Sequence, residues 1–153
     1  MRRLVDINRM NSVLNRVVDQ LAQNDGPNEL RRAKDILHKN LQQLGQYART
    51  EYLQENFYTI MFLESYSIHC YYYAATLVEL GHYEEAEDIG MLAAHILPSY
   101  NEEFFDECDR VVMRALLPRR KLPGITSKQI LQMNPPNVKQ AIKQLQLNLD
   151  KLP

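Results

Sequence analysis

Hydrophobic residues recur every three or four positions along most of the chain, which is the spacing that places them on one face of an α-helix. Turn-forming residues, chiefly glycine, proline and asparagine, separate these stretches. The segments with the helical pattern are approximately residues 4–23, 27–44, 57–80, 84–97, 102–117 and 135–152. We therefore expect an all-α protein built from antiparallel helical hairpins, assembled as a repeat array or as a helical bundle.

The sequence makes specific predictions about two of the helix ends. Gly45 could stop the second helix, or that helix could continue through it to about Gln54 at a cost of about 1 kcal/mol relative to alanine. Ser99 and Glu102 are spaced as a capping box, so we expect Ser99 to cap the helix that follows. The inward positions of that helix are expected to be Phe104, Cys108, Val111, Val112 and Ala115.

The segment 57–80 differs from the others because it contains neither glycine nor proline and is apolar on nearly all sides. A helix of this composition is contacted from several directions, so we expect it at the centre of the fold. Its three consecutive tyrosines, 71–73, point to different sides of the helix. At least one ring should therefore be exposed or lie at an interface, and Tyr71 and Tyr72 are the candidates.

The C-terminal part begins with a proline-containing basic stretch from Pro118 to Gly124, which we expect to separate a helical body of residues 1–117 from a segment of residues 118–153. Residues 126–133 are expected to form a short helix. The final helix carries apolar residues at alternating steps of four and three: Val138, Ile142, Leu145, Leu149 and Leu152. Two heptads are too few for an independent coiled coil, so this helix either docks on its own body or pairs with a partner or a second copy.

Charge divides the chain into three blocks. Residues 50–109 contain no lysine or arginine, 13 of the 19 acidic residues and 12 of the 13 aromatic residues. The net charges are +4 for residues 1–49, −13 for 50–109 and +8 for 110–153. A surface field of one sign selects partners of the opposite sign, so this pattern speaks to binding. The basic tail could also fold over the acidic block of the same chain or of a second copy.

Composition and motifs argue against an enzyme. The 153 residues are 45% hydrophobic with two cysteines, and the start of the chain lacks the apolar core of a signal peptide. We expect a soluble intracellular protein, cytoplasmic or nuclear, with both cysteines buried and reduced and no membrane contact. The four histidines lack metal-ligand spacing, and there is no phosphate-binding glycine loop. We therefore expect no catalysis, no metal and no cofactor.

Residues 67–100 span 34 positions and resemble a tetratricopeptide repeat. Small residues and a proline fall where that family prefers them, namely Ala74, Ala86, Ala93 and Pro98 at repeat positions 8, 20, 27 and 32. Cys70, Leu77 and Gly90 depart from the large aromatic residues usual at positions 4, 11 and 24. The resemblance covers about a fifth of the chain and implies an array of helical hairpins over roughly 28–117, with other helices as degenerate repeats.

The resemblance also implies a peptide-binding face on the first helix of the repeat. Its positions here are Ile68, Tyr71, Ala75, Val78 and Glu79. Family members that grip a terminal carboxylate place lysine, arginine and asparagine on this face, and none is present here. The resemblance therefore points to a basic or apolar protein segment as ligand. The alternative is that these residues pack against a neighbouring helix.

We hypothesise a non-enzymatic adaptor or scaffold subunit that binds a protein segment. The expected partner-binding residues are Ile68, Tyr71, Tyr72, Ala75, Val78, Glu79, Glu84 and Glu85. A second contact is expected from the tail through Arg119, Arg120, Lys121, Val138, Ile142, Leu145 and Leu149. One alternative is a homo-oligomer or complex subunit whose C-terminal helix packs on a partner. A nucleic-acid accessory protein is a less favoured alternative, because the tail lacks the aromatic residues that stack on bases.

Overall fold

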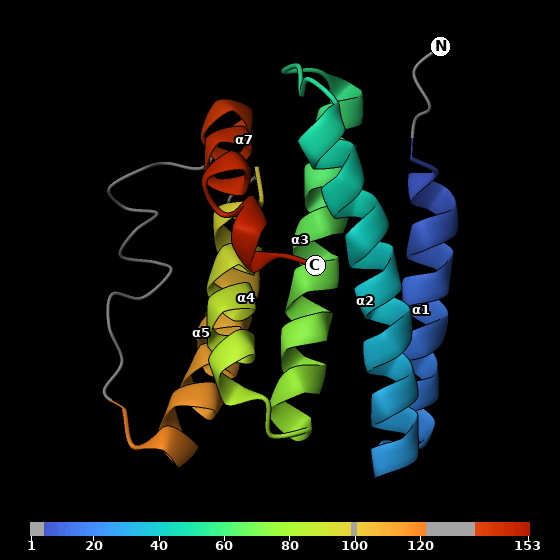
Figure 1. The fold of residues 1–153 in the computed structure, drawn as a ribbon, viewed down its shortest axis with the longest axis vertical. Helices are drawn as coiled ribbons and strands as arrows, with labels where there is room; N and C mark the ends of the chain where they lie inside the picture. Colours follow the sequence, from blue (N-terminus) through green and yellow to red (C-terminus); the bar gives the residue numbers. More distant parts are fainter. Residues whose placement is uncertain (1–4, 99–100, 122–136) are drawn as a thin grey trace.

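The computed structural model describes residues 5–98, 101–121 and 137–153 of the 153-residue chain. The predicted helix of residues 126–133 lies outside them. The elements, in chain order, are α1 (Ile7–Gln23), α2 (Pro27–Thr50), α3 (Phe57–Glu79), α4 (Tyr83–His95), α5 (Glu102–Leu116), the 3-10 helix η1 (Leu117–Arg119), α7 (Val138–Leu147) and the 3-10 helix η2 (Leu149–Lys151). Every regular element in these ranges is a helix, which confirms the predicted all-α class (Figure 1).

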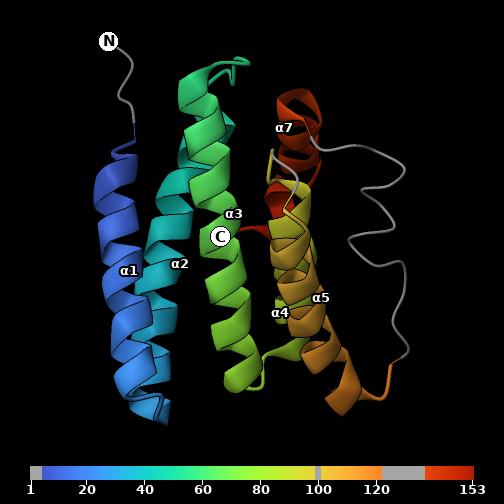
Figure 2. The ribbon, with the colours of Figure 1, turned by 180° about the vertical axis from the view of Figure 1, so that it is seen from behind.

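Consecutive helices run antiparallel and alternate between two layers. Each of α1 to α5 packs on the next one in the chain, and α3 also contacts both α1 and α5. The layer of α2 and α4 is nearer the viewer in Figure 1, and the layer of α1, α3 and α5 is nearer in Figure 2. The apolar helix α3 is therefore the central element, as its composition predicted.

Local sequence explains most of the helix ends. The side chains of Asp6, Asn56, Asn101 and Asn137 each accept a hydrogen bond from the backbone N–H three residues later, which satisfies a free donor of the first turn. The cap of α5 is therefore Asn101, two residues later than the predicted Ser99, and the predicted capping box was wrong. Gly81 ends the α3 region with φ 83°, a left-handed conformation that favours glycine.

Helix α2 continues through Gly45 to Thr50, which settles the boundary that the sequence left open. Close packing against the C-terminal segment accounts for a glycine at this position. A Cβ atom at position 45 would lie 2.7 Å from the carbonyl oxygen of Pro153 and 3.1 Å from the hydroxyl of Tyr66. Glycine here lets the last residues of the chain approach the backbone of α2, and this contact offsets its poor helix propensity.

Helix α7 completes the layer of α2 and α4. With 23 residues, α3 is about 35 Å long, whereas the 13 residues of α4 span about 20 Å. The 10-residue α7 adds about 15 Å beyond the end of α4 and contacts both α3 and α4 (Figure 1). Its docked side chains are Ala141, Ile142 and Leu145, joined by Leu152. Of the two arrangements left open for this helix, the structure has the one in which it docks on its own body.

The C-terminal segment is also held by hydrogen bonds. The guanidinium of Arg49, at the end of α2, donates to the carbonyl oxygens of Leu149 (2.7 Å), Leu152 (3.1 Å) and Pro153 (3.3 Å). These three acceptors belong to η2 and the residues after it, and the Leu149 oxygen also accepts from the backbone N–H of Leu152. One side chain of the body therefore anchors the backbone of the tail.

The core runs the length of the molecule around α3. Its largest fully buried side chains include Phe62, Tyr66, Tyr73 and Phe105. Phe105 is the fully buried ring of α5, which the sequence pattern did not predict, and Phe104 is partly buried and packs against the core. Cys70 and Cys108 are free and buried, as expected. No helix of the described part is long and apolar enough to cross a membrane.

Candidate functional site

Helix α3 lies between α1 and α5 in its layer (Figure 2). One line of its side chains is exposed to solvent. We call it the α3 stripe, and it consists of Met61, Glu64, Ile68, Tyr71, Tyr72, Ala75 and Glu79. These residues are partly or fully exposed, whereas the intervening positions are buried. Because α3 is apolar on nearly all sides, its outward face is mainly apolar and aromatic as well. An outward helix face of this kind is a candidate contact surface.

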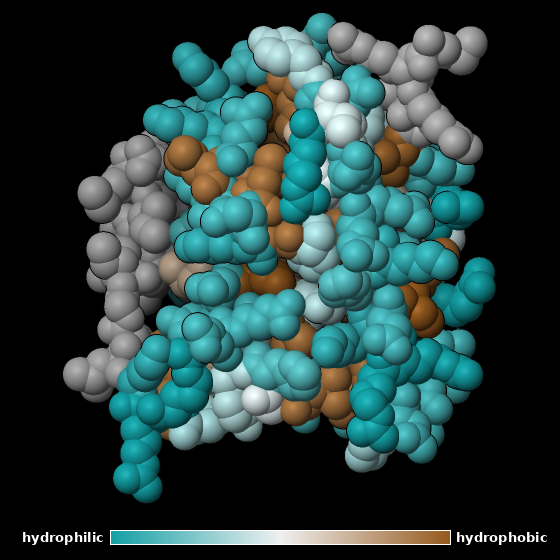
Figure 3. Space-filling view, viewed as in Figure 1, coloured by the Kyte–Doolittle hydropathy of each residue, from teal (hydrophilic) through white to brown (hydrophobic). Residues whose placement is uncertain are grey.

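The opposite side of the molecule looks different. In Figure 3, which views the layer of α2 and α4, hydrophilic side chains cover most of the face and apolar atoms appear in a broken line through the middle. The acids Glu84 and Glu85, in the first turn of α4, are exposed away from the α3 stripe. The carboxylate of Glu85 accepts a hydrogen bond of 3.2 Å from the hydroxyl of the buried Tyr73. The structure therefore does not bring these two expected contact residues together with the others.

On the side of α1, the α3 stripe borders a hollow of about 260 Å³, which we call the α1–α3 pocket. Its lining residues are Ile7, Asn11, Leu14 and Asn15 from α1 and Met61, Glu64, Ser65 and Ile68 from α3. Apolar side chains make up half of this lining, and Glu64 is its one charged residue. The pocket was not predicted, because its lining combines two helices whose contact the sequence pattern did not specify.

A buried polar network lies behind this pocket and joins three helices. The hydroxyl of Ser65 donates to Oδ1 of Asn11 (2.6 Å), and Nδ1 of His69 lies 2.7 Å from the carbonyl oxygen of Ser65. Nε2 of His69 lies 3.2 Å from the side-chain nitrogen of Asn40 on α2. The imidazole therefore carries its proton on Nδ1 and accepts from Asn40 at Nε2. Burial lowers the pKa of His69, so the neutral ring is favoured.

This network contains a serine and a histidine, but its geometry is structural. The hydroxyl of Ser65 donates to Asn11, and the His69 nitrogen nearest to it, Nδ1 at 3.4 Å, is the protonated one. His69 is fully buried, with both ring nitrogens engaged. A general base must be able to accept the proton of the nucleophile, and it must lie where a substrate can reach it. The His69 ring meets neither condition. In the sequence analysis, His69 was treated only as one of four scattered histidines. The signal that could have indicated this network is the spacing of Ser65 and His69, two polar residues four positions apart on an apolar helix.

On the side of α5, aromatic rings pack along the stripe. The ring of Tyr71 lies 5.0 Å from that of Tyr72 and 5.7 Å from that of Phe104, measured between centroids. Burial, reinforced by the carboxylate of Glu107, raises the pKa of Tyr71 to about 12, so its phenol is neutral at physiological pH. Both Tyr71 and Tyr72 are half-buried, while Tyr73 is in the core. The two rings expected at an interface are thus the two that reach the surface.

At the far end of the stripe, Glu79 forms an ion pair with Arg114 of α5. Val78, one of the expected contact residues, is only 7% exposed and belongs to the core. The repeat positions predicted Val78 on the concave face. In the structure α3 is packed on both sides at this point, and of the predicted residues near this end of the stripe only Ala75 and Glu79 are accessible. Five of the six expected α3 residues therefore share one surface: Ile68, Tyr71, Tyr72, Ala75 and Glu79.

Most of the tail residues that were expected to contact a partner instead contact the body of the same chain. Nη1 of Arg119 donates to Oε2 of Glu87 on α4 at 2.6 Å, which joins the basic tail to the acidic block. Ile142 and Leu145 are buried against the body, and Val138 and Leu149 are partly buried there. Arg120, with φ 53°, and Lys121 are exposed.

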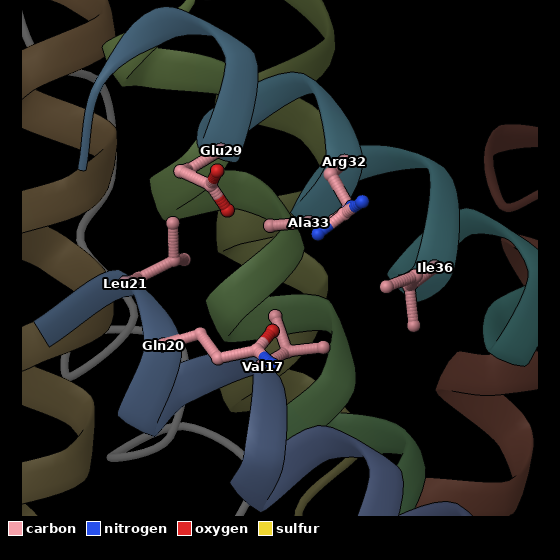
Figure 4. Close-up of a pocket in the computed structure, with 7 residues that line it drawn as sticks. All are labelled: Val17, Gln20, Leu21, Glu29, Arg32, Ala33 and Ile36. Carbon is pink, nitrogen blue, oxygen red and sulfur yellow. The ribbon is translucent and has the colours of Figure 1, made fainter. Parts of the chain in front are cut away.

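A second hollow, between α1 and α2, carries no site. Figure 4 shows its lining side chains, Val17, Gln20 and Leu21 of α1 and Glu29, Arg32, Ala33 and Ile36 of α2. The gap is too narrow to admit a water molecule and is a packing seam. Within the described residues, no cluster of three or more histidine, cysteine, aspartate or glutamate side chains could hold a metal ion.

Comparisons with protein-family models, with curated proteins and with solved structures find no match to this chain.

Proposed function

We propose that this protein is a non-enzymatic adaptor that binds a basic, amphipathic protein segment along the α3 stripe. The single observation that carries the proposal is the outward apolar and aromatic face of the central helix, which lies between α1 and α5. Elsewhere on the described surface, α-helical positions facing solvent are mainly polar. A central helix that keeps Ile68, Tyr71 and Tyr72 at its surface supports a role in binding.

Charge supports a basic partner. The carboxylates of Glu64, on the side of α1, and Glu107, on the side of α5, lie beside the stripe. At its far end the charge of Arg114 is balanced by the ion pair with Glu79. Residues 50–109, which include all of α3 and α4, contain no lysine or arginine. Such a surface attracts a cationic segment and repels a polyanion, which disfavours nucleic acid as the ligand.

The form of the ligand follows from the shape of the surface. An outward helix face flanked by α1 and α5, with spaced apolar side chains, suits a helix that presents apolar residues at i, i+3 or i+4 and i+7. The resemblance of residues 67–100 to a tetratricopeptide repeat supports the same face, because Ile68, Tyr71, Ala75 and Glu79 occupy positions that line the groove in that family.

Selection from a displayed library of random 16-residue peptides tests this proposal, with counter-selection against an Ile68→Glu variant. We expect enrichment of peptides with net positive charge and apolar residues at helical spacing. Their affinity should fall about tenfold or more in Ile68→Glu and in Tyr72→Ala, the loss typical of residues central to an interface. Leu147→Glu is the matched control, because Leu147 is a 65% exposed apolar residue on α7. Enrichment of acidic peptides, or equal binding to all three variants, would overturn the proposal.

A further inference from the structure

We infer that the α1–α3 pocket receives one lysine or arginine side chain of the bound segment. This inference rests on the proposed function and names the residue type that the site selects. The aliphatic part of the inserted side chain would contact Ile7, Leu14 and Ile68, and its charged group would pair with the carboxylate of Glu64.

The size of the pocket points to a single side chain. Its volume of about 260 Å³ is below the roughly 300–1,000 Å³ of pockets that hold drug-sized ligands. It opens at the surface beside Ile68, which is 37% exposed and belongs to the α3 stripe. A side chain from a segment lying on the stripe would therefore enter it directly, without a separate path.

The apolar lining suits the stem of such a side chain. Ile7 and Leu14 from α1 face Met61 and Ile68 from α3, so apolar groups from both helices border the hollow. Lysine and arginine bury three or four methylene groups along apolar surface while their charged ends reach a polar group. A short polar side chain would leave this apolar lining uncovered.

The polar lining selects a cation. Glu64 is the one charged lining residue, and no cationic residue borders the pocket. Within the described parts of the chain, the Glu64 carboxylate has neither an ion-pair partner nor a hydrogen bond. Asn11 and Asn15 add amide groups whose oxygens accept hydrogen bonds from an ammonium or guanidinium group. An anionic group would be repelled by the carboxylate of Glu64, the one charged group of the lining.

The pocket is preorganised by the buried network behind it. The hydrogen bond from Ser65 fixes the amide oxygen of Asn11, and that oxygen has a second lone pair for a ligand. The contact of His69 with Asn40 holds the same part of α3 against α2, and its contact with the carbonyl oxygen of Ser65 fixes the ring. A lining that is already in place lowers the ordering cost of binding.

The experiment is an NMR titration of the intact, isotope-labelled protein with n-butylguanidinium and, in parallel, with n-butylurea, its neutral isostere. We expect saturable shifts of the Asn11 and Asn15 side-chain amides and of the Ile7, Leu14 and Ile68 methyl groups with the cation. The dissociation constant should be on the order of 10 mM for a ligand of this size. n-Butylurea should bind at least about threefold more weakly, the loss expected for one exposed ion pair.

Glu64→Gln is the decisive variant, because it keeps the shape of the side chain and removes its charge. Its affinity for n-butylguanidinium should fall about threefold or more, whereas Glu55→Gln, an exposed acid in the loop before α3, should bind as the wild type does. Equal affinity for the two ligands, or an equal effect of the two variants, refutes the inference. Tyr72 does not line the pocket, so the two proposals can fail separately. If Tyr72→Ala leaves peptide binding unchanged while n-butylguanidinium still binds, the proposed function is wrong and the inference about the pocket is retained.

Discussion

The side-chain nitrogen of Asn40 lies 3.2 Å from Nε2 of His69, and this contact joins α2 to α3 in the interior of the protein. It requires the unprotonated form of Nε2, because an amide N–H can donate only to a nitrogen that has a free lone pair. The same amide lies 3.5 Å from the carbonyl oxygen of Met10, so Asn40 also reaches α1. The packing of three helices therefore depends on a neutral imidazole.

The first prediction is that stability falls as the pH drops below about 6.5. Burial lowers the pKa of His69 in the folded state relative to 6.5, so the unfolded chain binds the proton more tightly. Its contribution is fully present above pH 6.5 and is lost as the pH falls below that value toward the folded pKa. Between pH 7.5 and 5.5 the loss should reach at most about 1.4 kcal/mol for this residue.

Urea denaturation at the two pH values measures this loss. Burial also lowers the pKa of His95, so the contribution of each ring must be separated. NMR titration of the two rings in the folded protein identifies them, and a His95→Gln variant should retain the part of the pH dependence that belongs to His69. Titration of the His69 ring at or above pH 6.5 would contradict the prediction.

The second prediction concerns Arg49, whose guanidinium donates to three carbonyl oxygens of the C-terminal segment. Arg49→Met keeps much of the aliphatic stem and removes the donors, so we expect a loss of about 1–3 kcal/mol in the free energy of unfolding. Hydrogen exchange should accelerate in residues 138–153 more than in α1 or α3, because only the tail loses its anchor. Lys39→Met, at an exposed position of α2, is the control and should leave exchange in the tail unchanged.

The third prediction concerns Gly45, where an added Cβ would lie 2.7 Å from the carbonyl oxygen of Pro153. Gly45→Ala gains up to about 1 kcal/mol in helix propensity, but the close approach to backbone costs typically about 1–3 kcal/mol. We therefore expect net destabilisation in the full chain. In a chain that ends at residue 137 the same substitution should be less harmful or stabilising, and a matched pair of urea denaturation curves compares the two backgrounds. The same loss in both would show that the tail is not the cause.

The fold class and most helix positions followed from periodicity, because burial of an apolar face depends on spacing that is visible in the sequence. The continuation of α2 through Gly45 did not. The glycine at this position packs against Pro153, more than 100 residues later in the chain, and local propensity contains no information about that contact. The cap of α5 was misplaced for a related reason, since Ser99 and Asn101 are both good caps and the chain path decides between them.

The candidate site was predictable only in part. The outward position of Ile68, Tyr71 and Ala75 follows from helical spacing once one face of α3 is assigned. The burial of Val78 depends on the packing of other helices against the end of α3, and the α1–α3 pocket depends on the contact of two helices that are not consecutive. These are tertiary features, and residue spacing within one helix does not encode them.

The last prediction separates the binding surface from the core by comparing two residues of α3. Ile68 is 37% exposed and Val78 is 7% exposed, although repeat positions place both on the same face. Ile68→Gln should change the free energy of unfolding by no more than about 1 kcal/mol, because much of this side chain already contacts water. Val78→Gln should cost about 2–4 kcal/mol, because it puts an amide without partners among packed apolar groups. Urea denaturation with unchanged m-values measures both, and binding of the selected peptides should be lost in Ile68→Gln while its stability is retained. Comparable destabilisation by the two substitutions would place Ile68 in the core and remove it from the proposed surface.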